Sequence, residues 1–212
     1  MADRPIIFTG DSVRAILAGR KTQSRRVARG LAHDGTRLCA EQQACPYGAA
    51  GSRLWVRETW AGMDAFAFVG AHDVEPPQCV GYRADESALI WSDANRPPKP
   101  ADTTGWNWES PRIRWRSPIH MPRWASRLTL EILSVRVERV QAISEADARA
   151  EGFPIGEPVP VRVNGERVDM VFFDPRYAFA AAWDAINGRR AGCSWADNPF
   201  VWCLRFRRVE ET

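Results

Sequence analysis

A short segment near the N-terminus carries the residues best suited to chemistry. It reads Gly19-Arg20-Lys21-Thr22-Gln23-Ser24-Arg25-Arg26 and places four cations around two hydroxyl groups. Lysine is rare in this chain, and Lys99 is the only other one. A serine close to a lysine could hydrolyse an amide, with the hydroxyl as nucleophile and the amine as base once it has lost its proton.

The charge of Lys21 decides whether it could act as a base. Neighbouring arginines should lower its pKa by repulsion, burial would lower it further, and a paired carboxylate would raise it. If the segment continues as a helical turn, Lys21 and Ser24 lie on one face. The alternative is a solvated helix end, where the cations only complement the helix dipole.

The composition indicates a folded protein and says little about its function. The 212 residues are 45% hydrophobic, which allows one domain with a packed core, and the net charge of +3 does not by itself indicate nucleic acid. The preference for arginine suits phosphate binding, although a GC-rich genome would produce it too. The sequence shows no signal segment and no membrane-length apolar run, so we expect a cytoplasmic protein with no membrane partner.

The elements that must position this segment alternate between strands and short helices. A strand is expected at 5–8, followed by a helix that Asp11 and Ser12 cap and Gly19 ends. Residues 28–52 read as a loop, and 53–60 alternate as a half-buried strand. Later strands are expected over 127–140 and 200–209, helices over 145–151 and 175–187, and a hairpin over 154–169 that turns at Asn164-Gly165.

Residues 61–118 form an irregular stretch rich in proline, with a strand-like piece at 78–83. Connections of this length are usually functional or poorly ordered, and the tryptophans here favour order. The order of elements predicts an α+β fold: a small mixed or antiparallel β-barrel with flanking helices. We expect one domain over 1–212, with a core of about 4–60 and 125–210 and a tryptophan-rich insert of about 61–124.

Four segments, in this order, resemble the ASCH domains, and in particular the longer form found in phages and prophages. They are residues 16–26 (ILAGRKTQSRR), 51–58 (GSRLWVRE), 143–152 (ISEADARAEG) and 198–202 (NPFVW). The first is the most specific, and together they cover about half of the chain. The resemblance implies a β-barrel similar to the PUA fold, and a nucleotide or nucleic-acid ligand in a cleft beside the first helix.

The resemblance also implies an activity. Small bacterial members of the family are amidohydrolases that remove the acetyl group from N4-acetylcytidine, and their lysine, hydroxyl and glutamate positions fall on Lys21, Ser24 and Glu151. Those enzymes have threonine where this chain has Ser24, a change that keeps the hydroxyl. Glu151 could pair with the lysine, move a proton to the leaving amine or hold the nucleobase.

Other members of the family bind or cleave RNA. A ribonuclease, a non-catalytic module for single-stranded RNA or DNA, and a phage structural or host-interaction protein therefore remain alternatives. The expected partner is a modified nucleoside or a single-stranded nucleic acid, RNA rather than DNA.

Further residues are candidates for contacts to such a ligand. They are Arg20, Thr22, Arg25 and Arg26 in the first segment, Arg57 and Glu58 at the end of a strand, and Arg123 and Trp124 in a stretch that mixes aromatic residues with arginines. Stacking on aromatic rings combined with guanidinium contacts is how proteins hold single strands. The alternatives are that the tryptophans pack the insert onto the barrel and that Arg57 and Glu58 form a structural ion pair.

The sequence does not predict a cofactor or a metal. It has neither a phosphate-binding loop nor a dinucleotide fingerprint. The five cysteines lack close pairing and suit free thiols, and Cys39, Cys45 and His33 have poor spacing for zinc. None of the three histidines lies in the elbow motif typical of a serine-histidine-acid triad.

Overall fold

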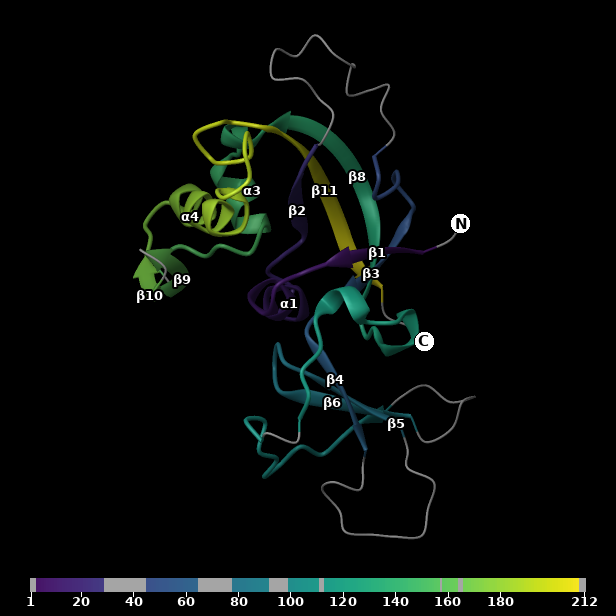
Figure 1. The fold of residues 1–212 in the computed structure, drawn as a ribbon. Helices are drawn as coiled ribbons and strands as arrows, with labels where there is room; N and C mark the ends of the chain where they lie inside the picture. The colour runs from purple at the N-terminus through teal and green to yellow at the C-terminus, as the bar shows by residue number, and fades with distance from the viewer. Residues whose placement is uncertain are drawn as a thin grey trace, which may run out of the picture. The chain divides into compact units, whose positions relative to one another are not determined.

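A computed structural model describes residues 3–28, 45–64, 78–91, 99–110, 113–156, 158–163 and 166–209 (Figure 1). The strands are β1 (Arg4–Ile7), β2 (Gln23–Val27), β3 (Arg53–Arg57), β4 (Trp60–Asp64), β5 (Gln78–Tyr82), β6 (Ser87–Trp91), β7 (Lys99–Pro100), β8 (Thr129–Arg139), β9 (Pro158–Val163), β10 (Glu166–Val171) and β11 (Phe200–Val209). The α-helices are α1 (Gly10–Leu17), α3 (Glu145–Ala150) and α4 (Pro175–Asn187).

The strands form three sheets, and the pairings with a defined register are antiparallel. The largest sheet has the order β1-β3-β8-β11-β2, the second has the order β4-β5-β6-β7, and β9 and β10 form a hairpin. This confirms the expected α+β class with antiparallel strands and few helices. Over the described residues the order of the largest sheet is open, with β1 and β2 at its edges, so a closed barrel is not seen.

The chain divides into two compact units. The first comprises Met1–Arg4, Ala15–Leu54 and Leu130–Thr212, and the second comprises Pro5–Arg14 and Trp55–Thr129. The expected insert of 61–124 therefore lies wholly within the second unit.

The core of the first unit lies between β11 and its helices. Val201 and Cys203 of β11 pack with Ala148 of α3 and with Phe179 and Trp183 of α4. Figure 1 shows α3 beside one end of β2, β8 and β11, with α4 next to α3 and the β9–β10 hairpin next to α4. Each helix begins as expected, because the side chains of Ser144 and Asp174 accept hydrogen bonds from backbone N–H groups of the first turn.

The core of the second unit combines aromatic and smaller side chains in two clusters. Trp60, Val80, Tyr82, Met121 and Ala125 form one buried cluster. A second cluster contains Ala61, Cys79, Ala88, Trp108 and Ile113, against which Trp106 and Trp115 pack. These tryptophans therefore do pack the 61–124 segment, within its own unit.

Several expected elements differ in the structure. The strand expected over 53–60 is two strands, β3 and β4, and β6 and β7 were not expected. The largest difference is β2, because residues 23–27 form a strand rather than a helical turn. Its sequence, Gln-Ser-Arg-Arg-Val, has no apolar alternation, although Gln23, Ser24 and Arg25 are all buried.

Candidate functional site

Lys21 and Glu151 form a buried ion pair, although they lie far apart in the sequence. Nζ of Lys21 donates to Oε2 of Glu151 at 2.7 Å and to the backbone carbonyl of the same residue at 2.8 Å. The two residues are only 6% and 5% exposed. The structure thus brings together two of the three side chains that the family resemblance assigns to catalysis.

Two backbone features hold the pair in place. After α1, Gly19 takes a positive φ of 72°, and the N–H of Lys21 donates to the carbonyl of Ala15 at 3.0 Å. Residues 21 and 22 then lie antiparallel to the residues at the end of α3. Lys21 and Glu151 form a β-bridge, and the N–H of Thr22 donates to the carbonyl of Ala150. The side chains therefore meet because their backbones are already paired.

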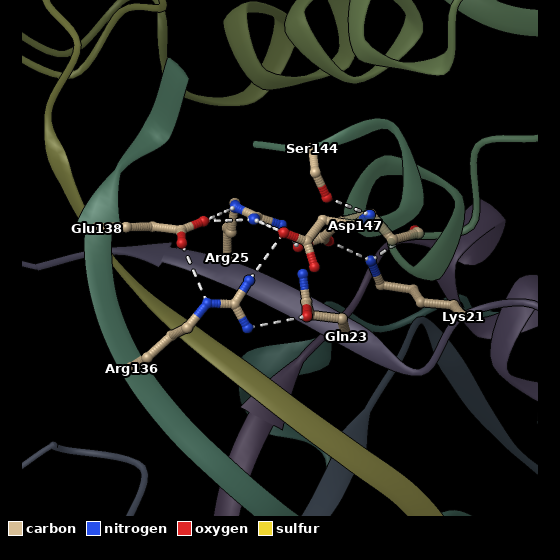
Figure 2. A network of polar contacts seen from close by, with 8 residues as sticks. Lys21, Gln23, Arg25, Arg136, Glu138, Ser144 and Asp147 are labelled. Atoms are coloured by element: carbon tan, nitrogen blue, oxygen red, sulfur yellow. Dashed lines mark hydrogen bonds and ion pairs between the residues drawn. The ribbon is translucent and has the colours of Figure 1, made fainter. Parts of the chain in front are cut away.

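A larger polar cluster surrounds this pair (Figure 2). Arg25, whose side chain is fully buried, contacts three carboxylates: Glu138, Asp147 at 3.0 Å and Glu151 at 3.3 Å. Arg25 therefore cannot act as a surface contact for phosphate in this conformation, because its charge is directed at neighbouring carboxylates.

Arg136 completes the cluster from β8. Its guanidinium contacts Glu138 at 3.0 Å and Asp147 at 2.8 Å, and it donates to the side-chain oxygen of Gln23 at 3.3 Å. Figure 2 shows these side chains facing one another between β8, β2 and the start of α3. Three cations, Lys21, Arg25 and Arg136, thus face three carboxylates, Glu138, Asp147 and Glu151.

Arg136, Glu138 and Asp147 were not predicted from the sequence as site residues. A signal was present, because Arg136 and Glu138 lie two residues apart on one face of the expected 127–140 strand, and Asp147 lies in the first turn of the expected helix. What the sequence could not show is that both elements face β2.

Burial controls the charge of Lys21. Burial lowers the pKa of its amine, Arg26 and Arg25 lower it further, and Glu151 opposes them without reversing the direction. The two outer carboxylates behave differently. Burial would raise the pKa of Glu138 and Asp147, but the arginine contacts hold both pKa values below their usual range. A lysine with a lowered pKa gives up its proton more easily than usual, as a lysine that acts as a general base must.

The side chain of Ser24 lies on the face of β2 opposite to the Gln23 and Arg25 side chains of this cluster. Side chains alternate along a strand, so Ser24 shares a face with Arg26, opposite Gln23 and Arg25. The expectation that a helical turn would align Ser24 with Lys21 is wrong, because the segment is extended. Lys21 itself precedes β2, at the end of the strand, where the charge of Arg26 reaches it.

The remaining candidates of the first segment differ in exposure. Arg20 and Thr22 are exposed, and Arg26 is half-buried. Burial lowers the pKa of Arg26, whose charge interacts with Tyr47 and Glu151. Arg20 and Thr22 are therefore the residues of this segment that a ligand in solution could contact directly.

Glu58, a candidate in the second unit, is held by a different partner from the one expected. It is 1% exposed and accepts two hydrogen bonds from Arg127, each of 2.9 Å, so the predicted alternative of a pair with Arg57 is replaced by a pair with Arg127. Arg127 also contacts Asp85 at 2.8 Å and lies over the ring of Tyr82. Burial raises the pKa of Glu58 despite Arg127. Because Glu58 is buried and paired with Arg127, its role in the second unit is structural.

Arg57, Arg123 and Trp124 reach the surface of the second unit. Trp124 is 50% exposed, and Arg57 and Arg123 are half-buried. The guanidinium of Arg57 lies 4.5 Å from the ring centre of Trp55 and donates to the carbonyl of Ile119.

The described residues contain no group of three or more potential metal ligands. Cys39 and His33 lie outside the described residues, and Cys45 is half-buried with a free thiol. No helix in the described ranges is long and apolar enough to cross a bilayer.

Comparisons with known proteins give little further information. No protein-family model matches the chain, and no curated protein matches it. Among solved structures, it is similar to the crystal structure of a protein from Enterococcus faecalis V583, described as a DUF984 family model. The two chains are 12% identical over 99% of this chain and 77% of the other, with a TM-score of 0.42. A likeness this weak carries no argument about function.

Proposed function

We propose that the protein is an amidohydrolase that removes an acyl group from a modified cytidine of the N4-acetylcytidine type. The proposal combines the resemblance of four segments to ASCH domains, with their PUA-like barrel, and the site geometry. The observation that carries it is the buried Lys21–Glu151 pair, whose Nζ–Oε2 distance is 2.7 Å. Two residues that the resemblance places in one active site are 130 positions apart in sequence and in contact.

The proposed chemistry assigns one role to each residue. The Ser24 hydroxyl attacks the acyl carbonyl while its proton passes to the amine of Lys21, for which a lowered pKa is favourable. The carbon–nitrogen bond then breaks, and Lys21 returns the proton to the cytosine amine as it leaves. Water hydrolyses the acyl-serine and releases the carboxylic acid. Glu151 orients the Lys21 amine, which donates to its Oε2 at 2.7 Å.

The test is direct. The protein is incubated with N4-acetylcytidine, and cytidine release is followed by chromatography. We expect turnover by the wild type, loss of at least about 100-fold in Ser24→Ala and Lys21→Met, and retained activity in Ser24→Thr, which keeps the hydroxyl. Lys99→Met is the matched control, because Lys99 is the other lysine and is exposed.

Thermal melting of each variant identifies any that fails to fold. No turnover by folded wild type at high concentration would exclude this activity on N4-acetylcytidine. Undiminished turnover by folded Ser24→Ala would exclude the assigned nucleophile.

A further inference from the structure

The second unit contains a surface that the amidohydrolase proposal does not use. Residues 110–130 include five arginines, at positions 112, 114, 116, 123 and 127, and no aspartate or glutamate. Arg127 is neutralised by Glu58 and Asp85. Arg114 and Arg116 are exposed, and Arg123 is half-buried. The stretch is therefore positively charged where it meets solvent, which favours a polyanionic partner.

The backbone of this surface is held in place by turns and by buried side chains. Two 3-10 turns, Pro118–His120 and Arg123–Ala125, each follow or begin at a proline and close with backbone hydrogen bonds. Met121 between the two turns and Ala125 at the end of the second turn anchor the stretch, because they are only 1% and 0% exposed. The carbonyl of Ala125 also accepts a hydrogen bond from the buried Tyr82 hydroxyl at 2.9 Å. A stretch held this firmly loses little entropy when a ligand binds.

Large apolar side chains nevertheless project from this stretch into solvent. Trp124 is 50% and Ile119 57% exposed. The indole of Trp124 stands edge-on to the buried Trp60, with ring centres 6.5 Å apart. Arg116 lies against the same Trp60, with its guanidinium carbon 5.3 Å from the ring centre. Trp60 thus supports an exposed aromatic ring and an exposed cation.

We propose that this surface, made of Arg57, Arg116, Ile119, Arg123 and Trp124, is a second site, which binds single-stranded nucleic acid. A base stacks on the exposed part of the Trp124 indole, and the arginines contact the flanking phosphates. An unpaired strand fits better than a duplex, because bases in a duplex are already stacked on their neighbours. The site lies entirely within the second unit and does not depend on the amidohydrolase proposal.

Binding is measured by fluorescence anisotropy with the full chain at low salt. The probes are a labelled oligouridylate of about 12 nucleotides, an oligothymidylate of the same length and a matched DNA duplex. We expect both single strands to bind more tightly than the duplex, and a preference for the RNA strand would indicate a contact to the 2′-hydroxyl. Undetectable binding of both single strands, or equal binding of the duplex, would overturn the proposal.

The variants separate stacking from charge. Trp124→Ala should weaken binding of the single strands about tenfold, whereas Trp124→Phe, which keeps a ring, should weaken it less than about threefold. The double variant Arg116→Gln/Arg123→Gln should reduce the slope of log affinity against log salt by about 1.4, since each phosphate contact to a single strand contributes about 0.7.

Matched controls come from the first unit. Tyr177→Ala removes an aromatic ring that is 69% exposed, and Arg189→Gln/Arg205→Gln removes two exposed arginines. Both should bind as the wild type does. If Trp124→Ala and the double arginine variant are folded by thermal melting and bind like these controls, the site is not where we place it.

Discussion

Glu151 is the carboxylate that Lys21 and Arg25 share, so its charge matters to both. Replacing Glu151 with glutamine leaves two buried cations short of a counter-charge. We expect Glu151→Gln to lower the free energy of unfolding by about 3 kcal/mol, since breaking one side of a buried ion pair is costly. The measurement is urea denaturation at neutral pH. A loss within about 0.5 kcal/mol, typical of surface substitutions, would contradict it.

The same residue gives a pH-dependent prediction. In Glu151→Gln the contact that opposes the low pKa of Lys21 is lost, so the pKa falls further below its usual value. The folded form then holds fewer protons than the unfolded chain, and stability rises with pH. The deficit of Glu151→Gln relative to the wild type should shrink between about pH 7 and pH 10. In Lys21→Met/Glu151→Gln, which lacks the titrating amine, the deficit relative to the wild type should not shrink over this range.

At the scale of elements, the turn after α3 depends on Gly152. It has a φ of +96°, and a Cβ added there would lie 3.0 Å from Cβ of Ala15 and 3.3 Å from Cβ of Lys21. Gly152→Ala should cost about 2–4 kcal/mol, from backbone strain together with crowding. Gly19→Ala is the control, because Gly19 also has a positive φ but nothing lies within 4 Å of its added Cβ. It should cost only about 1 kcal/mol in the same denaturation experiment; equal costs would exclude crowding.

The elements show what the sequence could and could not predict. Strands with apolar alternation, such as β8 and β11, and helices with a cap and a glycine stop, such as α3 and α4, were predicted close to their bounds. β2 was missed because its buried residues are polar. Its burial is stabilised by charges on β8 and α3, which are distant in sequence, and no local pattern reports such partners.

The same reason limits prediction of the candidate site. Lys21 and Glu151 were identified together only through the family resemblance, whereas Arg136, Glu138 and Asp147, which surround them, carry no motif of their own. Residues that belong to a local motif could be predicted as site residues. Residues that the order of strands in the sheet brings to the site could not.

At the scale of the whole molecule, both units depend on carboxylates that must stay ionised. Despite burial, arginine contacts hold the pKa of Glu138 and Asp147 in the first unit, and of Asp85 in the second, below the usual range. A lowered carboxyl pKa contributes stability that is present above the ordinary value, near about pH 4, and is lost as the pH falls further. The raised pKa of Glu58 acts in the opposite direction.

We therefore expect the free energy of unfolding to fall steeply between about pH 5 and pH 3. Arg136→Gln removes a contact from both Glu138 and Asp147. Its free energy of unfolding should be lower than that of the wild type at neutral pH and should fall less steeply as the pH drops from about 5 to about 3. Arg207→Gln is the control, because Arg207 pairs with Glu131 on the surface and its side chain is 65% exposed. It should follow the wild-type curve in urea denaturation across this range. Parallel curves for Arg136→Gln and the wild type would contradict the prediction.

The scarcity of lysine has a practical consequence. Of the two lysine side chains, Lys99 on β7 is exposed, whereas Lys21 is buried against Glu151. An amine-reactive reagent should therefore label Lys99 at once and Lys21 only when the first unit opens. The difference between the two labelling rates, measured by peptide mass spectrometry, reports how often the structure around Lys21 opens locally. The wild-type chain carries both the slow and the fast reporter, so no foreign probe has to be introduced.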